Sequence, residues 1–159
     1  MFRVIKLALI SFVFLFLIVT AISLFIPSHI RLSKAVNIGD HKKQVMALIG
    51  DTSQWGKWHP LFIHYDSLMQ PPPVTITPMV QNDSVIMVRM QFGTQKPVVN
   101  GWQFYNYSST DSLTLQWYMD FHLNWYPWQK FGSMMYENTY GVMMEQGLNN
   151  IKKLVEHTP

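Results

Sequence analysis

Hydrophobic and polar residues alternate without interruption from Leu113 to Trp125. Apolar side chains occupy every odd position, whereas the even positions are polar or amphipathic and include Asp120 and His122. This alternation predicts a long β-strand, because successive side chains of a strand point to opposite faces of its sheet. Since one face is apolar and the other polar, we expect an antiparallel sheet with a single face on the core.

Four further segments have strand patterns. Residues 74–80 alternate but contain Pro78, which predicts an edge strand or a bulge because proline cannot donate to a sheet ladder. The proline run at residues 71–73 predicts a loop before that strand, and Asn82 with Asp83 predicts the turn after it. The other strand candidates are residues 29–38, 84–92 and 98–107.

The period of the pattern changes after Pro127. Residues recur at alternating intervals of three and four, which predicts one stripe along a C-terminal helix of about six turns. A shorter helix is predicted over residues 40–50, where Asp40 can cap the start and Gly50 can end it. The stripe of the long helix consists of Met134, Glu137, Gly141, Met144, Leu148, Ile151 and Val155.

The N-terminal region contains an uncharged segment, residues 7–26, that is long enough to cross a bilayer as a helix. We expect an N-terminal membrane anchor over residues 1–28 and one compact domain over residues 29–159. A cleaved signal peptide is the alternative, because a basic leader precedes the segment and Ala21-Ile22-Ser23 would be a tolerable cleavage site. The basic charges of the leader favour a domain on the non-cytoplasmic side, although Arg31 and Lys34 lie on the other flank.

The stretch DTSQWGKWHPLF, residues 51–62, places two tryptophans three residues apart. Asp51 and Gln54 have the spacing of a capping box, and Pro60 limits the helix that they would start. Trp55 and Trp58 would then share one face. Core packing and contact with a ligand are both open for this pair, since large aromatic side chains supply buried area in either role.

Charge and composition exclude some functions. Of the twelve Lys and Arg residues, two precede the uncharged segment, so ten follow it, against nine Asp and Glu. Such a balance gives no basic patch, and we expect no nucleic-acid partner. The chain has no cysteine, which excludes disulfides and thiol catalysis.

The order of predicted elements is one strand, two short helices, a run of antiparallel strands and a long C-terminal helix. This α+β order resembles the helix-grip fold of the START-like (SRPBCC) superfamily, which includes polyketide cyclase and dehydrase-like proteins. The resemblance rests on RLSKAVNIGDHKKQVMALIGD, on the W-x-x-W-x-P element in QWGKWHP, and on EQGLNNIKKLVE after YPWQKF. It covers nearly all of residues 29–157. It implies a curved sheet that wraps around the long helix, with a cavity for an apolar ligand between them.

Candidate residues follow from that arrangement. Glu137 would look toward the cavity mouth and could bind the polar end of a ligand, although a surface role near a helix start is equally ordinary for a glutamate. The many methionines could line an adaptable pocket or simply fill a core. The candidate ligand-binding wall is Trp102, Phe104, Leu115, Trp117, Met119, Phe121, Met144 and Leu148.

Three residues are weak catalytic candidates. Asp120 and His122 lie two apart on the same side of the long strand, so that a carboxylate and an imidazole could act together. The alternative is that this row faces solvent on the convex side. Glu137 is the third candidate. His59, His64 and Asp66 would need a loop to bring them together, and we expect no metal and no cofactor.

The leading hypothesis is a membrane-anchored domain that binds an apolar or amphipathic, lipid-like small molecule. One alternative is an enzyme of the polyketide cyclase or dehydratase type that uses an acid and a base in the cavity. The other is a ligand-free interaction domain of a membrane assembly. An exposed apolar patch around Tyr126, Trp128 and Phe131 would favour this last alternative.

Overall fold

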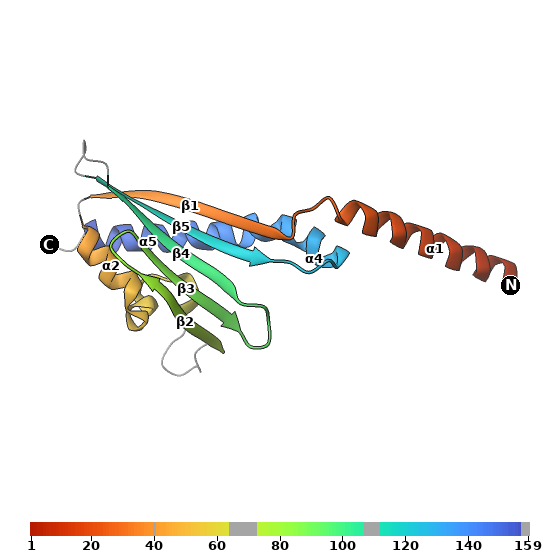
Figure 1. Cartoon of the computed structure of the whole chain (residues 1–159), viewed down its shortest axis with the longest axis horizontal. Coiled ribbons are helices and arrows are strands. Elements are labelled where there is room, and N and C mark those ends of the chain that lie inside the picture. The colour runs from red at the N-terminus through yellow and green to blue at the C-terminus, as the bar shows by residue number, and fades with distance from the viewer. Residues whose placement is uncertain (40, 64–72, 107–111, 157–159) are drawn as a thin grey trace.

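The structure is a computed structural model that describes residues 1–39, 41–63, 73–106 and 112–156. Its five strands form one antiparallel sheet in the order β1-β5-β4-β3-β2. The strands are β1 (His29–Gly39), β2 (Val74–Gln81), β3 (Val85–Phe92), β4 (Val98–Asn106) and β5 (Ser112–His122). The chain is therefore α+β, and the curved sheet partly surrounds the C-terminal helix α5 (Val142–Glu156) (Figure 1).

The strand predictions hold in most details. β2 is an edge strand, and its register with β3 shifts between Pro78 and Val80, as the proline in an alternating segment predicted. The prediction for β5 is wrong at one end, because the strand stops at His122. Trp125 is consequently outside the sheet, and 59% of its surface is exposed.

The C-terminal helix is less regular than its sequence pattern predicted. After α4 (Pro127–Gly132) come a 3₁₀ turn, η2 (Ser133–Met135), and a π-helical turn, η3 (Glu137–Gly141), before α5 begins. Met144, Leu148, Ile151 and Val155 are buried as expected, but Met134 is 70% exposed. The buried stripe therefore begins at Gly141, because the wider π turn rotates the preceding residues out of phase with α5.

The described residues between β1 and β2 form two short helices and a 3₁₀ helix. They are α2 (Lys42–Gly50), η1 (Thr52–Lys57) and α3 (Pro60–Ile63). Asp51 caps η1, and its Oδ1 accepts a hydrogen bond from the backbone N–H of Ser53 at 2.9 Å. The capping prediction is confirmed at Asp51, whereas Asp40 lies outside the described residues.

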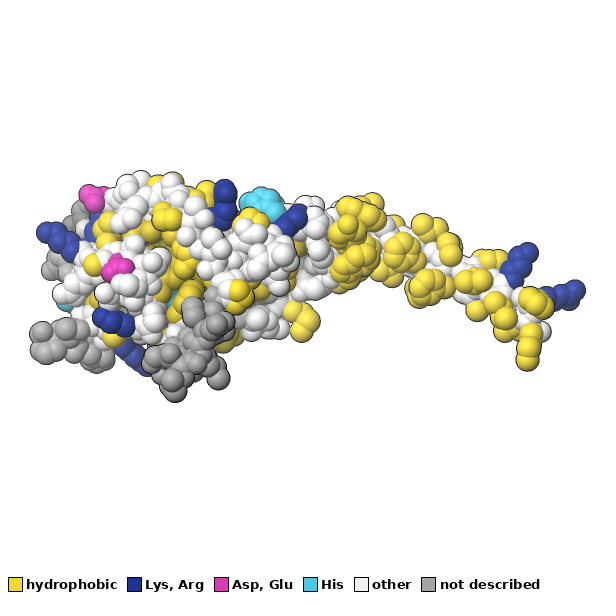
Figure 2. All heavy atoms as spheres, turned by 90° about the horizontal axis from the view of Figure 1, so that it is seen from below, with side chains coloured by type: hydrophobic (Ala, Val, Ile, Leu, Met, Phe, Trp, Pro, Cys, Tyr) yellow, Lys and Arg dark blue, Asp and Glu magenta, His cyan; other side chains and the backbone are white. Residues whose placement is uncertain are grey.

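The N-terminal helix α1 (Phe2–Ser23) projects from one end of the domain (Figure 1). It is long and apolar enough to cross a membrane, and a signal sequence would share these properties. Hydrophobic side chains cover it along its length (Figure 2). Its end is attached to α4, because Nζ of the buried Lys130 donates to the carbonyl oxygen of Ile26 at 2.6 Å and to Oγ of Ser28 at 2.7 Å.

Candidate ligand-binding site

The concave face of the sheet and the facing side of α5 enclose an aromatic and aliphatic interior. Trp102 of β4 pairs in register with Trp117 of β5, and their ring centroids lie 5.3 Å apart. Every residue of the predicted ligand-binding wall belongs to this interior and is less than a tenth exposed: Trp102, Phe104, Leu115, Trp117, Met119, Phe121, Met144 and Leu148.

Trp55 of η1 and Trp58, the residue that follows η1, enter the same interior. The ring of Trp58 lies edge-on to Trp102 and Trp117, with centroids 6.0 and 5.8 Å away. Both indole N–H groups are satisfied by backbone carbonyls, that of Trp55 by Ile49 at 2.8 Å and that of Trp58 by Leu48 at 2.9 Å. The pair is thus part of the packed core, where edge-to-face contacts stabilise aromatic clusters.

Three buried hydrogen-bond donors in this interior have no acceptor among the described residues. They are Nε2 of His59, Nδ2 of Asn100 and Nε1 of Trp102, and all three residues are fully buried. Asn100 is oriented by Trp117, whose indole N–H donates to Oδ1 of Asn100 at 3.1 Å. Because the indole can only donate, the amide nitrogen of Asn100 must point elsewhere.

Nε2 of His59 is a donor because the other ring nitrogen, Nδ1, already acts as an acceptor. Its Nδ1 accepts the backbone N–H of Leu61 at 3.3 Å, so in the neutral imidazole the proton resides on Nε2. Burial lowers the pKa of His59 to about 3, which keeps the ring neutral. The ring lies 5.2 Å from Trp117, so all three unpaired donors belong to residues grouped around the Trp102 and Trp117 indoles.

A pocket of about 400 Å³ opens at the end of the sheet nearest α1. Phe121, Tyr136 and Tyr140 form its aromatic part, with ring centroids 4.8 to 5.2 Å apart. We call it the membrane-end pocket, because Gln129 of α4 lines it and α4 contacts α1, the helix that is long and apolar enough to cross a membrane. Its lining residues are 94–98, 121–124, Gln129, Tyr136 and Tyr140.

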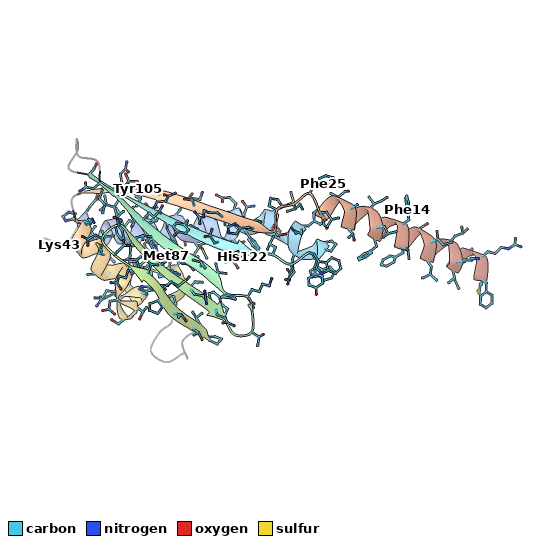
Figure 3. The ribbon with its side chains drawn as sticks, in the orientation of Figure 1. Phe14, Phe25, Lys43, Met87, Tyr105 and His122 are labelled. Carbon is cyan, nitrogen blue, oxygen red and sulfur yellow. The ribbon has the colours of Figure 1, made fainter. Side chains whose placement is uncertain are left out.

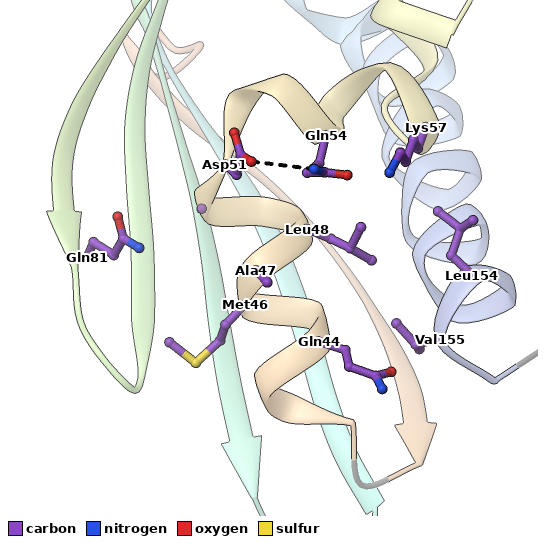
Figure 4. Close-up of a pocket in the computed structure, with 11 residues that line it drawn as sticks. Gln44, Met46, Ala47, Leu48, Asp51, Gln54, Lys57, Gln81, Leu154 and Val155 are labelled. Atoms are coloured by element: carbon purple, nitrogen blue, oxygen red, sulfur yellow. Dashed lines mark hydrogen bonds between the residues drawn. The ribbon is translucent and has the colours of Figure 1, made fainter. Parts of the chain in front are cut away.

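A second pocket, of about 590 Å³, lies at the opposite end of the domain (Figure 4). Met46, Leu48, Leu154 and Val155 supply apolar surface, and polar residues of α2, η1 and β2 surround them. We call it the remote pocket. Figure 3 shows the separation of the two ends, since Lys43 of α2 lies at the end opposite α1 and His122 of β5 lies toward α1.

The predicted polar contact, Glu137, lies at the edge of β1. Its carboxylate pairs with Nζ of Lys34 at 2.6 Å, and its side chain is 53% exposed. Lys34 also pairs with Glu145 at 2.7 Å, and its hydrogen bonds to Glu137 and Glu145 raise the pKa of the ammonium group. In this position the carboxylate stabilises an ion triad between β1 and the C-terminal helix.

The other acid-base candidates lie on the convex face of the sheet. Arg31 donates to both carboxylate oxygens of Asp120 at 2.7 Å and covers the ring of Tyr118 at 4.4 Å. His122 is exposed, stacks on His29 at 4.6 Å and borders the membrane-end pocket. Neither Asp120 nor Glu137 lines the interior between sheet and helix.

No group of three or more metal-binding side chains occurs among the described residues, and His64 and Asp66 lie outside them. Sequence reasoning missed Asn100, although its spacing of two from Trp102 placed a polar residue on an apolar face. It also missed Tyr136 as a pocket residue, because its contact with Phe121 joins distant parts of the chain.

No protein-family model and no curated protein sequence matches the chain. Solved structures do match it. A START superfamily protein from Mycobacterium smegmatis is 15% identical, with a TM-score of 0.57 over 79% of this chain and 97% of that one. The Zhui aromatase/cyclase from Streptomyces is 12% identical, with a TM-score of 0.56 over 80% of this chain and 94% of its own.

The di-domain ARO/CYC protein BexL is 11% identical, with a TM-score of 0.59 over 83% of this chain and 52% of that protein. The chain therefore has the helix-grip fold of START-like proteins, as the resemblance in its sequence implied. At this level of identity the likeness establishes the fold, and any function has to be argued from the site.

Proposed function

We propose that this protein is a membrane-anchored domain that binds an apolar or amphipathic, lipid-like molecule between its sheet and α5. The observation that carries the proposal is the position of the membrane-end pocket. It includes Gln129 of α4, the helix that contacts α1, and it shares Phe121 with the buried aromatic interior. A molecule leaving the bilayer would meet this pocket first.

Apolar burial would supply most of the binding energy. A pocket of about 400 Å³ falls within the range of small-molecule sites. Transfer of roughly 300 Å² of ligand surface from water would contribute about 7.5 kcal/mol before the costs of association. Entry beyond Phe121 would require Tyr136 and Tyr140 to move, because their rings are in contact with it.

Three unpaired donors lie in the interior, beyond the lining of the membrane-end pocket, and a ligand that reached them would need a polar group. A buried N–H without an acceptor costs free energy, and an oxygen of a bound molecule would remove that cost. The donors of His59, Asn100 and Trp102 are neutral, so they suit a carbonyl, ester or hydroxyl oxygen. Water molecules bound in the interior could satisfy the same groups.

The enzyme alternative has less support. Asp120 is held by Arg31 on the convex face, and Glu137 is paired with Lys34 at an edge, so neither carboxylate faces the buried interior. His122 remains at the rim of the membrane-end pocket without an acid or base partner facing the interior. The interaction alternative has a specific observation in its favour, the exposed aromatic residues Trp128 and Phe131 of α4.

The test is lipid retention by matched variants of the full chain. The protein would be purified in detergent, and molecules extracted with organic solvent would be identified by mass spectrometry. Val98→Trp fills the membrane-end pocket, and Ala47→Trp fills the remote pocket in the same way. We expect the first variant to lose the bound molecule and the second to retain it.

Both variants keep α1, so lipids bound around that helix cancel in the comparison. Thermal unfolding of each variant would show that the domain still folds. Loss of the molecule in Ala47→Trp alone would place the ligand in the remote pocket. If all three proteins yield the same lipids in the same amounts, the proposal is wrong.

A further inference from the structure

Helix α4 has an inverted distribution of side chains. Its buried side contains Pro127, Lys130 and, just beyond its end, Ser133, of which two are polar. Its exposed side contains Trp128 and Phe131, which are 63% and 37% exposed. A surface helix in water normally has the opposite arrangement.

The exposed side continues into a larger apolar surface. Met134 and Met135 are 70% and 65% exposed, and Trp125 is 59% exposed. The rings of Trp125 and Trp128 lie 4.9 and 4.8 Å from Tyr126, which joins them into one aromatic row. We call Trp125, Trp128, Phe131, Met134 and Met135 the apolar platform. Clustered exposure of such residues marks a contact surface.

Hydrogen bonds connect the region of the apolar platform to the segment that follows α1. Nζ of Lys130 donates to the carbonyl oxygen of Ile26 and to Oγ of Ser28, and the backbone N–H of Leu123 donates to the carbonyl oxygen of Ser28 at 2.7 Å. Phe25, at the turn between α1 and β1, is 90% exposed (Figure 3). Any apolar phase that surrounds the last turn of α1 therefore also reaches α4.

We propose that the apolar platform lies in the interfacial layer of the lipid bilayer that α1 enters. Tryptophan and tyrosine are enriched at that depth, where their rings contact acyl chains and their polar atoms contact headgroups. The inference rests on the membrane anchoring included in the proposed function. It goes further by fixing the orientation of the domain, because the surface of α4 and the axis of α1 are held together.

This orientation has a consequence for the membrane-end pocket. Gln129 of α4 lines that pocket, and its Oε1 accepts the backbone N–H of Asn124 at 2.9 Å. With the apolar platform in the interface, the pocket opens at the level of the phospholipid headgroups. A membrane lipid could then enter without crossing bulk water.

The experiment uses the full chain in phosphatidylcholine nanodiscs that contain nitroxide-labelled phospholipids. The label is placed on the headgroup, at a shallow acyl position or at a deep acyl position. Of the six tryptophans, Trp55, Trp58, Trp102 and Trp117 are buried in the core, so Trp125 and Trp128 are the exposed reporters. The double variant W125F/W128F removes these reporters and keeps aromatic rings at both positions.

We expect headgroup and shallow labels to quench tryptophan emission more than the deep label does. That depth-dependent quenching should be lost in W125F/W128F. In nanodiscs that contain the unchanged protein, Trp125 and Trp128 should also be protected from acrylamide, a water-soluble quencher.

Two results would overturn the proposal. Emission that acrylamide quenches and lipid labels do not would place the platform in water, and protection from both quenchers would place it against a protein partner. A failure of the proposed function can be distinguished from a failure of this proposal, because it would be seen in the lipid recovered from Val98→Trp and Ala47→Trp. Platform quenching does not depend on a molecule bound in the interior.

Discussion

A Cβ atom on Gly147 would lie 2.7 Å from Cζ3 of Trp117, which is closer than packed atoms approach. The missing side chain of Gly147 therefore lets α5 lie directly against the central tryptophan of β5. Pro60 approaches the same position, 3.2 Å from that Cβ site. The contact joins the helix, the sheet and the connecting segment at the centre of the interior.

Gly147→Ala is expected to destabilise the domain by about 1–3 kcal/mol, the usual cost of overpacking a site where neighbouring atoms are already in contact. The helix would have to move away from Trp117 or the indole would have to leave its preferred position. Gly56→Ala is the matched control, because a Cβ atom there meets nothing within 4 Å. Thermal or urea unfolding of the full chain in detergent measures both. Equal stability of the two variants would contradict the close contact.

The ion pair of Arg31 and Asp120 tests whether the convex face of the sheet has a structural role only or also takes part in ligand binding. Asp120→Asn should remove a bidentate ion pair whose arginine is about half exposed, at a cost of about 1 kcal/mol. Arg31→Met should cost a similar amount, and the double variant should cost less than the sum. Lipid recovered from Asp120→Asn should equal that from the unchanged protein. Loss of the bound molecule in this variant would instead support a role for Asp120 in the site.

Lys130→Met tests the junction between α1 and the domain. The substitution keeps an unbranched side chain in the buried position but removes the donor to Ile26 and Ser28. We expect a loss of about 0.5–1.5 kcal/mol, because Ile26 is only partly buried, Ser28 is exposed and water can reach the freed oxygens. Spin labels on α1 and on β1 should then report a broader distance distribution. Lys96→Met, which removes an exposed contact with Asn124, is the control that should leave the distribution unchanged.

Much of the fold could be predicted from local pattern. The alternation around Trp117 identified both β5 and the face that becomes buried, because the two-residue period of a strand assigns each side chain to one face. Pro78 identified the edge strand, since a central strand would require its missing N–H. The buried stripe of α5 from Met144 to Val155 followed from helical spacing in the same way.

The features that the sequence could not predict depend on contacts between distant segments. The π turn at Glu137–Gly141 leaves no trace in the spacing of three and four, yet it rotates Met134 into solvent. The role of Lys130 depends on the return of the chain past Ile26, more than a hundred residues earlier. The apolar platform was predicted only as a possible patch, because its exposure depends on where β5 ends.

The buried neutral state of His59 leads to a prediction about pH. Burial lowers its pKa from 6.5 to about 3 in the folded protein, so between these values the unfolded chain binds a proton that the folded chain does not. Stability must therefore fall as the pH falls below about 6.5, by up to about 1.4 kcal/mol per unit, and this contribution levels off near pH 3. Above pH 7 His59 should contribute no pH dependence.

His59→Phe separates this effect from the titration of other groups. Phenylalanine keeps an aromatic ring beside Trp55, which now stacks on His59 at 5.4 Å, and it cannot be protonated. Unfolding of the full chain in detergent, followed by tryptophan fluorescence at pH 7 and pH 5, should show a smaller loss of stability in the variant. The variant also removes one unpaired donor, so its stability at pH 7 should change little apart from the loss of the bond from Leu61. Parallel pH dependence in the two proteins would show that His59 takes up a proton in the folded state, against the burial that the structure gives it.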